Sequence, residues 1–244
     1  MADYLEQVSQ AAAEHGFARE VVAEVDGCAI PAFTRLSESG PGVYLSSGIH
    51  GDEPAGPMAV LELLKQGDLC PEIEWRLCPM INPTGLAVGT RENAGGVDLN
   101  RDYLKKSTVE VSGHVSWLEK QPVPDVFLSL HEDWESTGFY LYEIQKSACD
   151  SVAHSILQAA AQVIEPEPSA VIDDHQVREP GWIFHKPRAD FPDDWPEAIY
   201  MAEQGTRVSY TLETPSSLEL ERRVACHKLA VCQAVQEFML TWGA

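Results

Sequence analysis

Hydrophobic and polar positions along the chain alternate between short β-prone runs and longer segments with helical spacing. Buried strands are predicted, in chain order, at residues 43–49, 75–81, 126–130 and 208–212, with a further apolar run at 139–144. Helices are predicted at residues 4–15, 54–64, 147–164 and 217–242. Strands that alternate with helices predict an α/β fold, with a mixed, largely parallel sheet that carries helices on both faces.

Two segments depart from this alternation. Near the N-terminus, β-prone runs at 21–25 and 28–30 flank Asp26-Gly27, which is a strong hairpin signal. From about 165 to 197 the chain holds five prolines, and we interpret this stretch as an insertion at the rim of a site. Because no repeat or linker divides the sequence, we expect residues 1–244 to form one domain.

Charge and composition exclude several classes of partner. The 244 residues include 38 acidic and 17 basic side chains, which gives a net charge of -21. Such a chain repels nucleic acid and anionic lipid, and its apolar runs are too short to span a membrane. Residues 1–6 lack the pattern of a signal peptide, and the six cysteines lack zinc-site spacing, so we expect a cytoplasmic protein without a disulfide framework. The sequence pattern predicts no particular oligomeric state.

Three ionisable residues each follow a predicted buried strand. They are His50, His131 and Glu213. Ligands of open α/β sheets bind at the carboxyl ends of the strands, so these side chains are expected to converge on one crevice. A polar residue at a strand end is common, and each of the three taken alone also fits an ordinary structural role.

The surroundings of His50 point to a metal. His50 and Glu53 lie three residues apart where a strand turns into a helix, and this spacing lets both face one ion. Together with His131 they form a His₂Glu set, which is one of the standard three-ligand sets of catalytic zinc. Glu213 then either completes the ligand set or accepts a proton from water bound to the ion, and we favour the second role. Glu213 could instead cap the helix that follows it.

A polar loop at residues 90–103 supplies two arginines in a chain that is poor in basic residues. An arginine binds a carboxylate through two hydrogen bonds, and it also stabilises the oxyanion formed by attack on a carbonyl. The structural alternative is that Arg91 or Arg101 pairs with Asp98 or Asp102 within the loop.

Four further histidines are expected at the surface or as helix caps. These are His15, His114, His154 and His227. His175 and His185 lie in the proline-rich stretch and receive no role.

These motifs together resemble the M14 metallocarboxypeptidase superfamily. The matching stretches are residues 48–53, 82–85, 91–101, 129–131 and 211–215, in the order of the family. The run Gly-Val-Asp-Leu-Asn-Arg at 96–101 is the most specific of them. In length and in its pattern of elements, the sequence is similar to members of the small bacterial branch of this superfamily. That branch includes murein peptide amidases and is related to the succinylglutamate desuccinylase/aspartoacylase group.

The resemblance implies a metal centre. It implies one zinc ion per chain, bound by His50, Glu53 and His131, with Glu213 as the general base and later proton donor. The implied fold is that of a zinc carboxypeptidase.

The resemblance also implies how substrate is held. Arg91 would polarise the scissile carbonyl, and Asn100 and Arg101 would bind the terminal carboxylate of the substrate. Many carboxypeptidases cover the substrate with a tyrosine; Tyr200 and Tyr210 are the nearest candidates here, and we assign that role to neither.

The function implied is that of a zinc-dependent amidohydrolase. It would cleave an amide bond in a small peptide or peptide-like substrate with a free carboxylate, through Glu-assisted attack of zinc-bound water. Deacylation of an N-acyl amino acid is the alternative within the same chemistry, and a zinc-binding scaffold without turnover is the alternative outside it.

Overall fold

An eight-stranded mixed sheet forms the centre of the computed structural model, which describes residues 2–37, 40–147 and 149–241. The strands, in their order across the sheet, are β1 (Ala18–Val25), β2 (Cys28–Arg35), β4 (Glu74–Cys78), β3 (Gly42–Ser47), β5 (Val126–Asp133), β10 (Val208–Pro215), β6 (Tyr140–Gln145) and β9 (Trp182–His185). Strands β4, β3, β5 and β10 run parallel, while β2 and β6 flank them antiparallel. The predicted fold class is confirmed.

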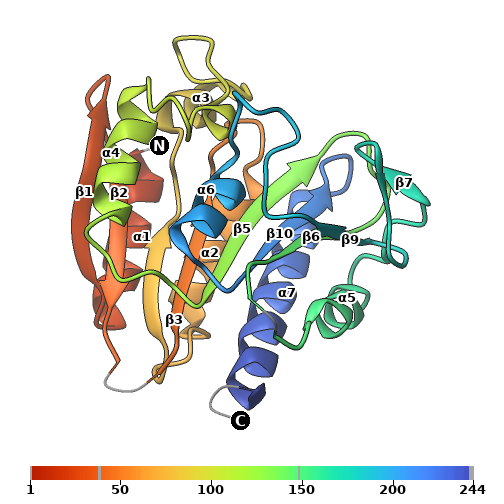
Figure 1. Cartoon of the computed structure of the whole chain (residues 1–244). Coiled ribbons are helices and arrows are strands. Elements are labelled where there is room, and N and C mark those ends of the chain that lie inside the picture. The colour runs from red at the N-terminus through yellow and green to blue at the C-terminus, as the bar shows by residue number, and fades with distance from the viewer. Residues whose placement is uncertain (1, 38–39, 148, 242–244) are drawn as a thin grey trace.

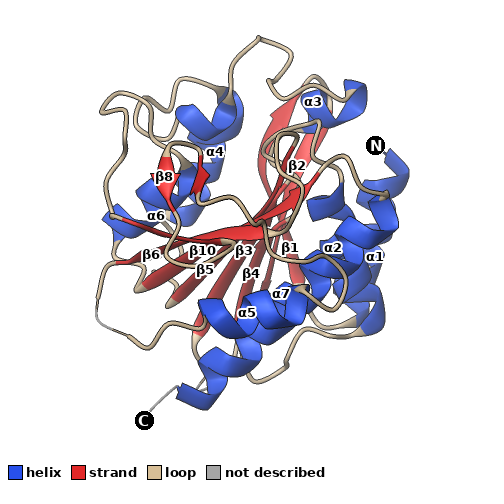
Figure 2. Ribbon diagram, turned by 90° about the vertical axis from the view of Figure 1, so that its right-hand side faces the viewer, coloured by secondary structure: helices blue, strands red, loops and turns tan. Residues whose placement is uncertain are grey.

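Helices cover both faces of this sheet (Figures 1 and 2). On one face lie α1 (Ala2–Glu14), α2 (Ala55–Gln66), α5 (Ala153–Ala160) and α7 (Leu220–Thr241). On the other face lie α4 (Val109–Leu118) and α6 (Glu197–Gln204), and the short helix α3 (Pro83–Val88) lies beside β2. Within the described ranges, no helix is both long and apolar enough to cross a membrane.

Side chains of the central strands alternate between these two faces. On β5, Val126, Leu128 and Leu130 join the large core under α2 and α7. The intervening Ser129 and His131 point to the opposite face, because successive residues of a strand alternate. The α6 face therefore holds apolar packing at the start of the strand and polar groups at its carboxyl end.

Several predicted elements end earlier than expected. The strands predicted at 43–49 and 75–81 stop at Ser47 and Cys78, because Gly48 adopts a positive φ and Pro79 lacks the N–H needed for the ladder. The helices predicted at 147–164 and 217–242 shorten to α5 and α7, and positions 148 and 242 lie outside the described residues.

The proline-rich stretch contributes to the sheet as well as to the rim. A hairpin of β7 (Val171–Ile172) and β8 (His175–Gln176) projects from it, and β9 then pairs in parallel with β6. Residues 186–196 lead from β9 to α6, and several of them line the pocket. All six cysteines are free.

Two histidines predicted at the surface or as helix caps are instead fully buried within the structure, so that prediction was wrong. His114 lies between the hydroxyl groups of Tyr44 and Tyr103, at 2.7 and 2.8 Å, and burial lowers its pKa to about 3. His227 contacts the Thr214 hydroxyl at 3.1 Å from helix α7. Both ring nitrogens of His114 have a tyrosine hydroxyl as partner, and these partners compensate the cost of its burial.

Candidate metal and substrate site

A pocket of about 410 Å³ opens at the carboxyl ends of the central strands. Glu213 and His131 lie directly opposite each other in the register of the parallel strands β10 and β5. His50 follows the end of β3, between β5 and β4. The strand-end convergence expected from the sequence thus places these three residues in the lining of one pocket.

Glycines shape the turn that carries His50. Gly48 has φ +62°, and a Cβ at Gly51 would lie 2.0 Å from the carbonyl carbon of Gly85. The Asn82 side chain accepts the Gly85 N–H and donates to the carbonyl of Arg91, and its own N–H donates to the Gly48 carbonyl. The motif at 82–85 therefore ties the His50 turn to the loop that bears Arg91.

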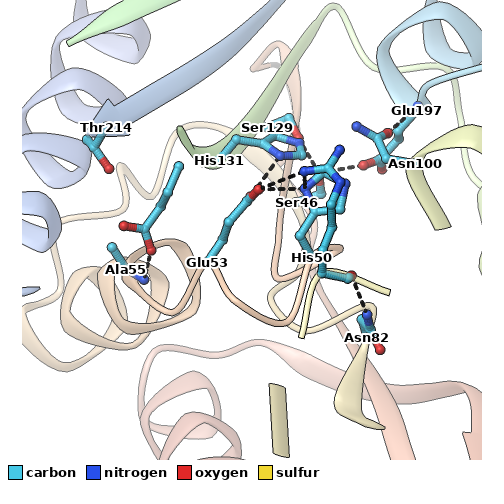
Figure 3. A network of polar contacts seen from close by, with 12 residues as sticks. Ser46, His50, Glu53, Ala55, Asn82, Asn100, Ser129, His131, Glu197 and Thr214 are labelled. Carbon is cyan, nitrogen blue, oxygen red and sulfur yellow. Dashed lines mark hydrogen bonds and ion pairs between the residues drawn. The ribbon is translucent and has the colours of Figure 1, made fainter. Parts of the chain in front are cut away.

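The three predicted ligands converge (Figure 3). Glu53 bridges the two histidines, with Oε1 at 2.6 Å from Nδ1 of His50 and Oε2 at 2.9 Å from Nδ1 of His131. All three residues are buried, and the candidate ligand atoms lie within 4.8 Å of one another. Two imidazole nitrogens and a carboxylate oxygen form a donor set suited to zinc, so the residues present fit a metal ion. Glu213 is not a member of this group.

Burial and charge act in opposite directions in this cluster. Burial by itself would lower the pKa of His50, but the carboxylates of Glu53 and Asp98 raise it to about 9. Burial would raise the pKa of Glu53, but the two imidazoles lower it below its ordinary value. Burial raises the pKa of Glu213 well above its ordinary value, and the Glu53 carboxylate adds to that shift. The carboxylate of Glu53 and the imidazoles of His50 and His131 therefore interact strongly with one another.

Asp98 lies beside the predicted metal ligands, and the sequence did not indicate this position. Its Oδ1 lies 3.2 Å from Nε2 of His50, and its Oδ2 pairs with Arg91 at 3.0 Å. A carboxylate on the second nitrogen of a ligating histidine fixes the tautomer and the orientation of the ring. The pairing of Arg91 with Asp98, considered above as a structural alternative, is present, and it also anchors Arg91 beside Glu53.

We expect Asp98→Asn to weaken metal binding without abolishing it. Loss of such a supporting carboxylate typically lowers metal affinity by about 10- to 100-fold. Competition for zinc against a chelator of known affinity measures this change. Asp102→Asn is the matched control, because Asp102 instead accepts bonds from Ser107 and Thr108. Equal zinc affinity in wild type and Asp98→Asn would contradict the assignment.

Asn100 and Arg101 lie on the same wall of the pocket, in the short helix η1 (Leu99–Arg101). The Asn100 amide oxygen accepts the Glu197 N–H at 2.9 Å. Arg101 is exposed, and within the described ranges it forms no ion pair with Asp98 or Asp102. Its guanidinium is therefore available to an anion entering the pocket.

Glu197 is a buried polar residue of the pocket lining, next to Asn100. Its carboxyl group accepts hydrogen bonds from Tyr44 at 2.7 Å and Ser46 at 2.8 Å, and burial raises its pKa to about 7. Figure 3 shows Ser46, Glu197 and Asn100 next to one another beside the ligand cluster. Because Tyr44 and Ser46 hold the Glu197 side chain and the Glu197 N–H binds Asn100, this network fixes the position of the Asn100 side chain.

Two tyrosines of β6 line the pocket and were missed from the sequence. Tyr140, which is the register partner of Glu213, donates to Asp133 at 3.1 Å, and Tyr142 donates to Asp173 at 2.6 Å. Tyr200 and Tyr210 do not line it. The alternation of Tyr140, Tyr142 and Ile144 was a usable signal, because it places all three on one face of a strand.

Comparisons with known proteins agree with this geometry. A family model for the succinylglutamate desuccinylase/aspartoacylase catalytic domain matches residues 39–175. The fold is similar to that of a candidate metallopeptidase from Shewanella denitrificans OS217, with a TM-score of 0.85 and 25% identity over 97% of this chain and 89% of that one. It is also similar to the murein-tripeptide amidase of Escherichia coli O157, with a TM-score of 0.64 and 16% identity over 92% and 95% of the two chains. The last likeness concerns the fold alone.

Among curated proteins, the chain is similar to Carboxypeptidase 2 of Trichophyton rubrum. The two are 38% identical over 73 residues, which cover 26% of this chain and 13% of the fungal protein. These similarities confirm the resemblance to metallocarboxypeptidases that the motifs indicated.

Proposed function

Because this chain belongs to the succinylglutamate desuccinylase/aspartoacylase catalytic-domain family, a family of hydrolases, we propose that it is a zinc-dependent amidohydrolase. Its substrate would be a small peptide or peptide-like amide with a free carboxylate. The observation that carries this proposal is the buried His-Glu-His cluster, which shares one pocket with Glu213 and Arg101.

His50, Glu53 and His131 would hold the ion. When bound, zinc would polarise the scissile carbonyl and acidify the attacking water. The geometry supports this because three protein ligands leave a coordination position open, as catalytic zinc requires. Asp98 would keep His50 in the tautomer that presents Nδ1 to the ion.

Glu213 would act as the general base and later as the acid. It would accept a proton from the attacking water and deliver it to the leaving nitrogen. Because Glu53 would share its negative charge with the ion, the repulsion that Glu53 exerts on Glu213 would weaken, and Glu213 would ionise more readily. The separation of Glu213 from the ligand group supports a base rather than a fourth ligand.

Arg91 and the η1 loop would orient the substrate. Arg91 lies beside Glu53 and His50 and would donate hydrogen bonds to the carbonyl oxygen as negative charge develops there. Asn100 and Arg101 would hold the substrate carboxylate and so place the scissile amide over the cluster. Each role uses a side chain that already lines the pocket.

Deacylation of an N-acyl amino acid is the second candidate, and the family match favours it. Both reactions use the same metal site and differ in the acyl group released. A zinc-loaded activity screen over small peptides and N-acyl amino acids separates them, with Glu213→Gln as the background control. Hydrolysis of neither class by the zinc-loaded protein would support a binding scaffold instead.

We expect Arg101→Ala to reduce kcat/KM for a free-acid substrate, mainly through KM. A charge-assisted hydrogen bond contributes about 1.5–3 kcal/mol, which corresponds to roughly 10- to 100-fold. The amidated analogue of the same substrate should be hydrolysed equally by both proteins. Arg19→Ala, at an exposed position on β1, is the control. Equal losses on the acid and the amide would refute carboxylate recognition by Arg101.

A further inference from the structure

A second group of metal-ligating side chains lies on the opposite wall of the pocket, in the proline-rich stretch. It consists of His175 on β8, His185 at the end of β9, and Asp190 in the loop that leads to α6. All three line the same pocket as the His-Glu-His cluster. None of them belongs to the first cluster.

The spacing of the three ligand atoms fits a cation. Asp190 Oδ2 lies 3.1 Å from Nε2 of His185 and 3.5 Å from Nε2 of His175, and the three atoms all lie within 4.8 Å of one another. A tetrahedral ion with bonds of about 2.0–2.2 Å separates its ligand atoms by roughly 3.3–3.6 Å. The 3.5 Å separation lies within this range and the 3.1 Å separation slightly below it, so a small movement of the exposed Asp190 side chain admits an ion between the carboxylate and the two imidazoles.

Aromatic packing holds the two imidazoles in place. Their ring centroids are 5.0 Å apart at an interplanar angle of 80°, and the ring of Tyr142 contacts both edge-on, at 5.8 and 6.2 Å. The Tyr142 hydroxyl is itself bound to Asp173, which belongs to the β7–β8 turn. A site with ring orientations set in advance loses less side-chain entropy when an ion binds.

From these observations we propose that His175, His185 and Asp190 form a second divalent-cation site, selective for zinc-like transition metals. Two imidazole nitrogens and one carboxylate suit zinc, cobalt and nickel, whereas magnesium and calcium favour oxygen ligands. The ion connects three separate segments, which are the β7–β8 hairpin, the edge strand β9 and the loop before α6. It thereby fixes the rim of the pocket, and the remaining coordination position takes water or an anionic group of a ligand.

Equilibrium dialysis of the full chain against buffered zinc, followed by metal analysis, tests this proposal without any substrate. Wild type should bind two zinc ions per chain. Asp190→Asn should bind one, because loss of a direct ligand weakens a site by more than the roughly 10- to 100-fold typical of a supporting residue. His50→Ala should also bind one, and the combination of both changes should bind none.

Two controls keep the result interpretable. Asp190 is largely exposed, so its substitution should leave the circular-dichroism spectrum and melting temperature of the zinc-depleted protein unchanged. His154→Gln removes an exposed histidine outside the pocket and should still bind two ions. One ion in wild type, retained in Asp190→Asn and lost in His50→Ala, would overturn the second site while leaving the first intact. Calcium binding with the affinity of zinc would overturn the stated selectivity.

Discussion

Replacing Glu213 by Gln should lower kcat by about 10²- to 10⁴-fold, which is the usual contribution of a general acid–base group. Gln keeps the shape of Glu but can neither accept a proton from the attacking water nor return it to the leaving nitrogen. Because Glu213 lies outside the His-Glu-His group, zinc content should remain at the wild-type level. Steady-state kinetics of the zinc-loaded proteins, with metal analysis of the same samples, measures both quantities.

Another carboxylate in the pocket provides the control for the loss of one negative charge. Glu135 also lines the pocket but is exposed and lies outside the cluster, so Glu135→Gln should retain most of the activity. Loss of zinc in Glu213→Gln would make Glu213 a ligand, and the site would then be closed. In that case the hydrolase mechanism proposed above would give way to a zinc-binding scaffold.

His50→Ala should abolish zinc binding at the His-Glu-His cluster and, with it, hydrolysis. Removing one of three ligands leaves an incomplete site, and it also leaves the buried Glu53 without one of its two imidazole partners. Zinc retained after dialysis against a moderate chelator should fall by one ion per chain. His131→Ala should behave in the same way.

The exposed His154 serves as the control for removing a histidine, and His154→Ala should retain all zinc and activity. Added zinc should not restore hydrolysis in His50→Ala at concentrations that saturate wild type. An unchanged zinc content in both ligand variants would show that the cluster is not the binding site.

The parts of the site that follow from strand order were predictable from the sequence. His50, His131 and Glu213 each follow an apolar run, and parallel strands bring such positions to one edge of the sheet. The local His50–Glu53 spacing predicted Glu53 as the third member of the candidate ligand group. These inferences needed only the pattern of each segment and the rule for where parallel sheets bind ligands.

The parts that depend on contacts between distant segments were not predictable. His114 and His227 are buried because tyrosines and a threonine from other elements accept or donate their hydrogen bonds. The β9 strand, only four residues long, forms because β6 offers it an edge. Asp98 gained its place beside His50 through a turn whose path depends on Asn82 and Gly85.

The register of β5 and β10 has a consequence for how this protein can diversify. His131 and Glu213 occupy facing positions on adjacent strands, so the spacing between the proposed metal ligand and the proposed base is set by the sheet itself, at about 4.8 Å between strands. Loops that surround the pocket can change length or sequence without altering that spacing. Substrate selectivity can therefore change through the loops at the rim while the distance between His131 and Glu213 stays the same. Exchanging these loops between relatives would then change the substrate without changing that distance.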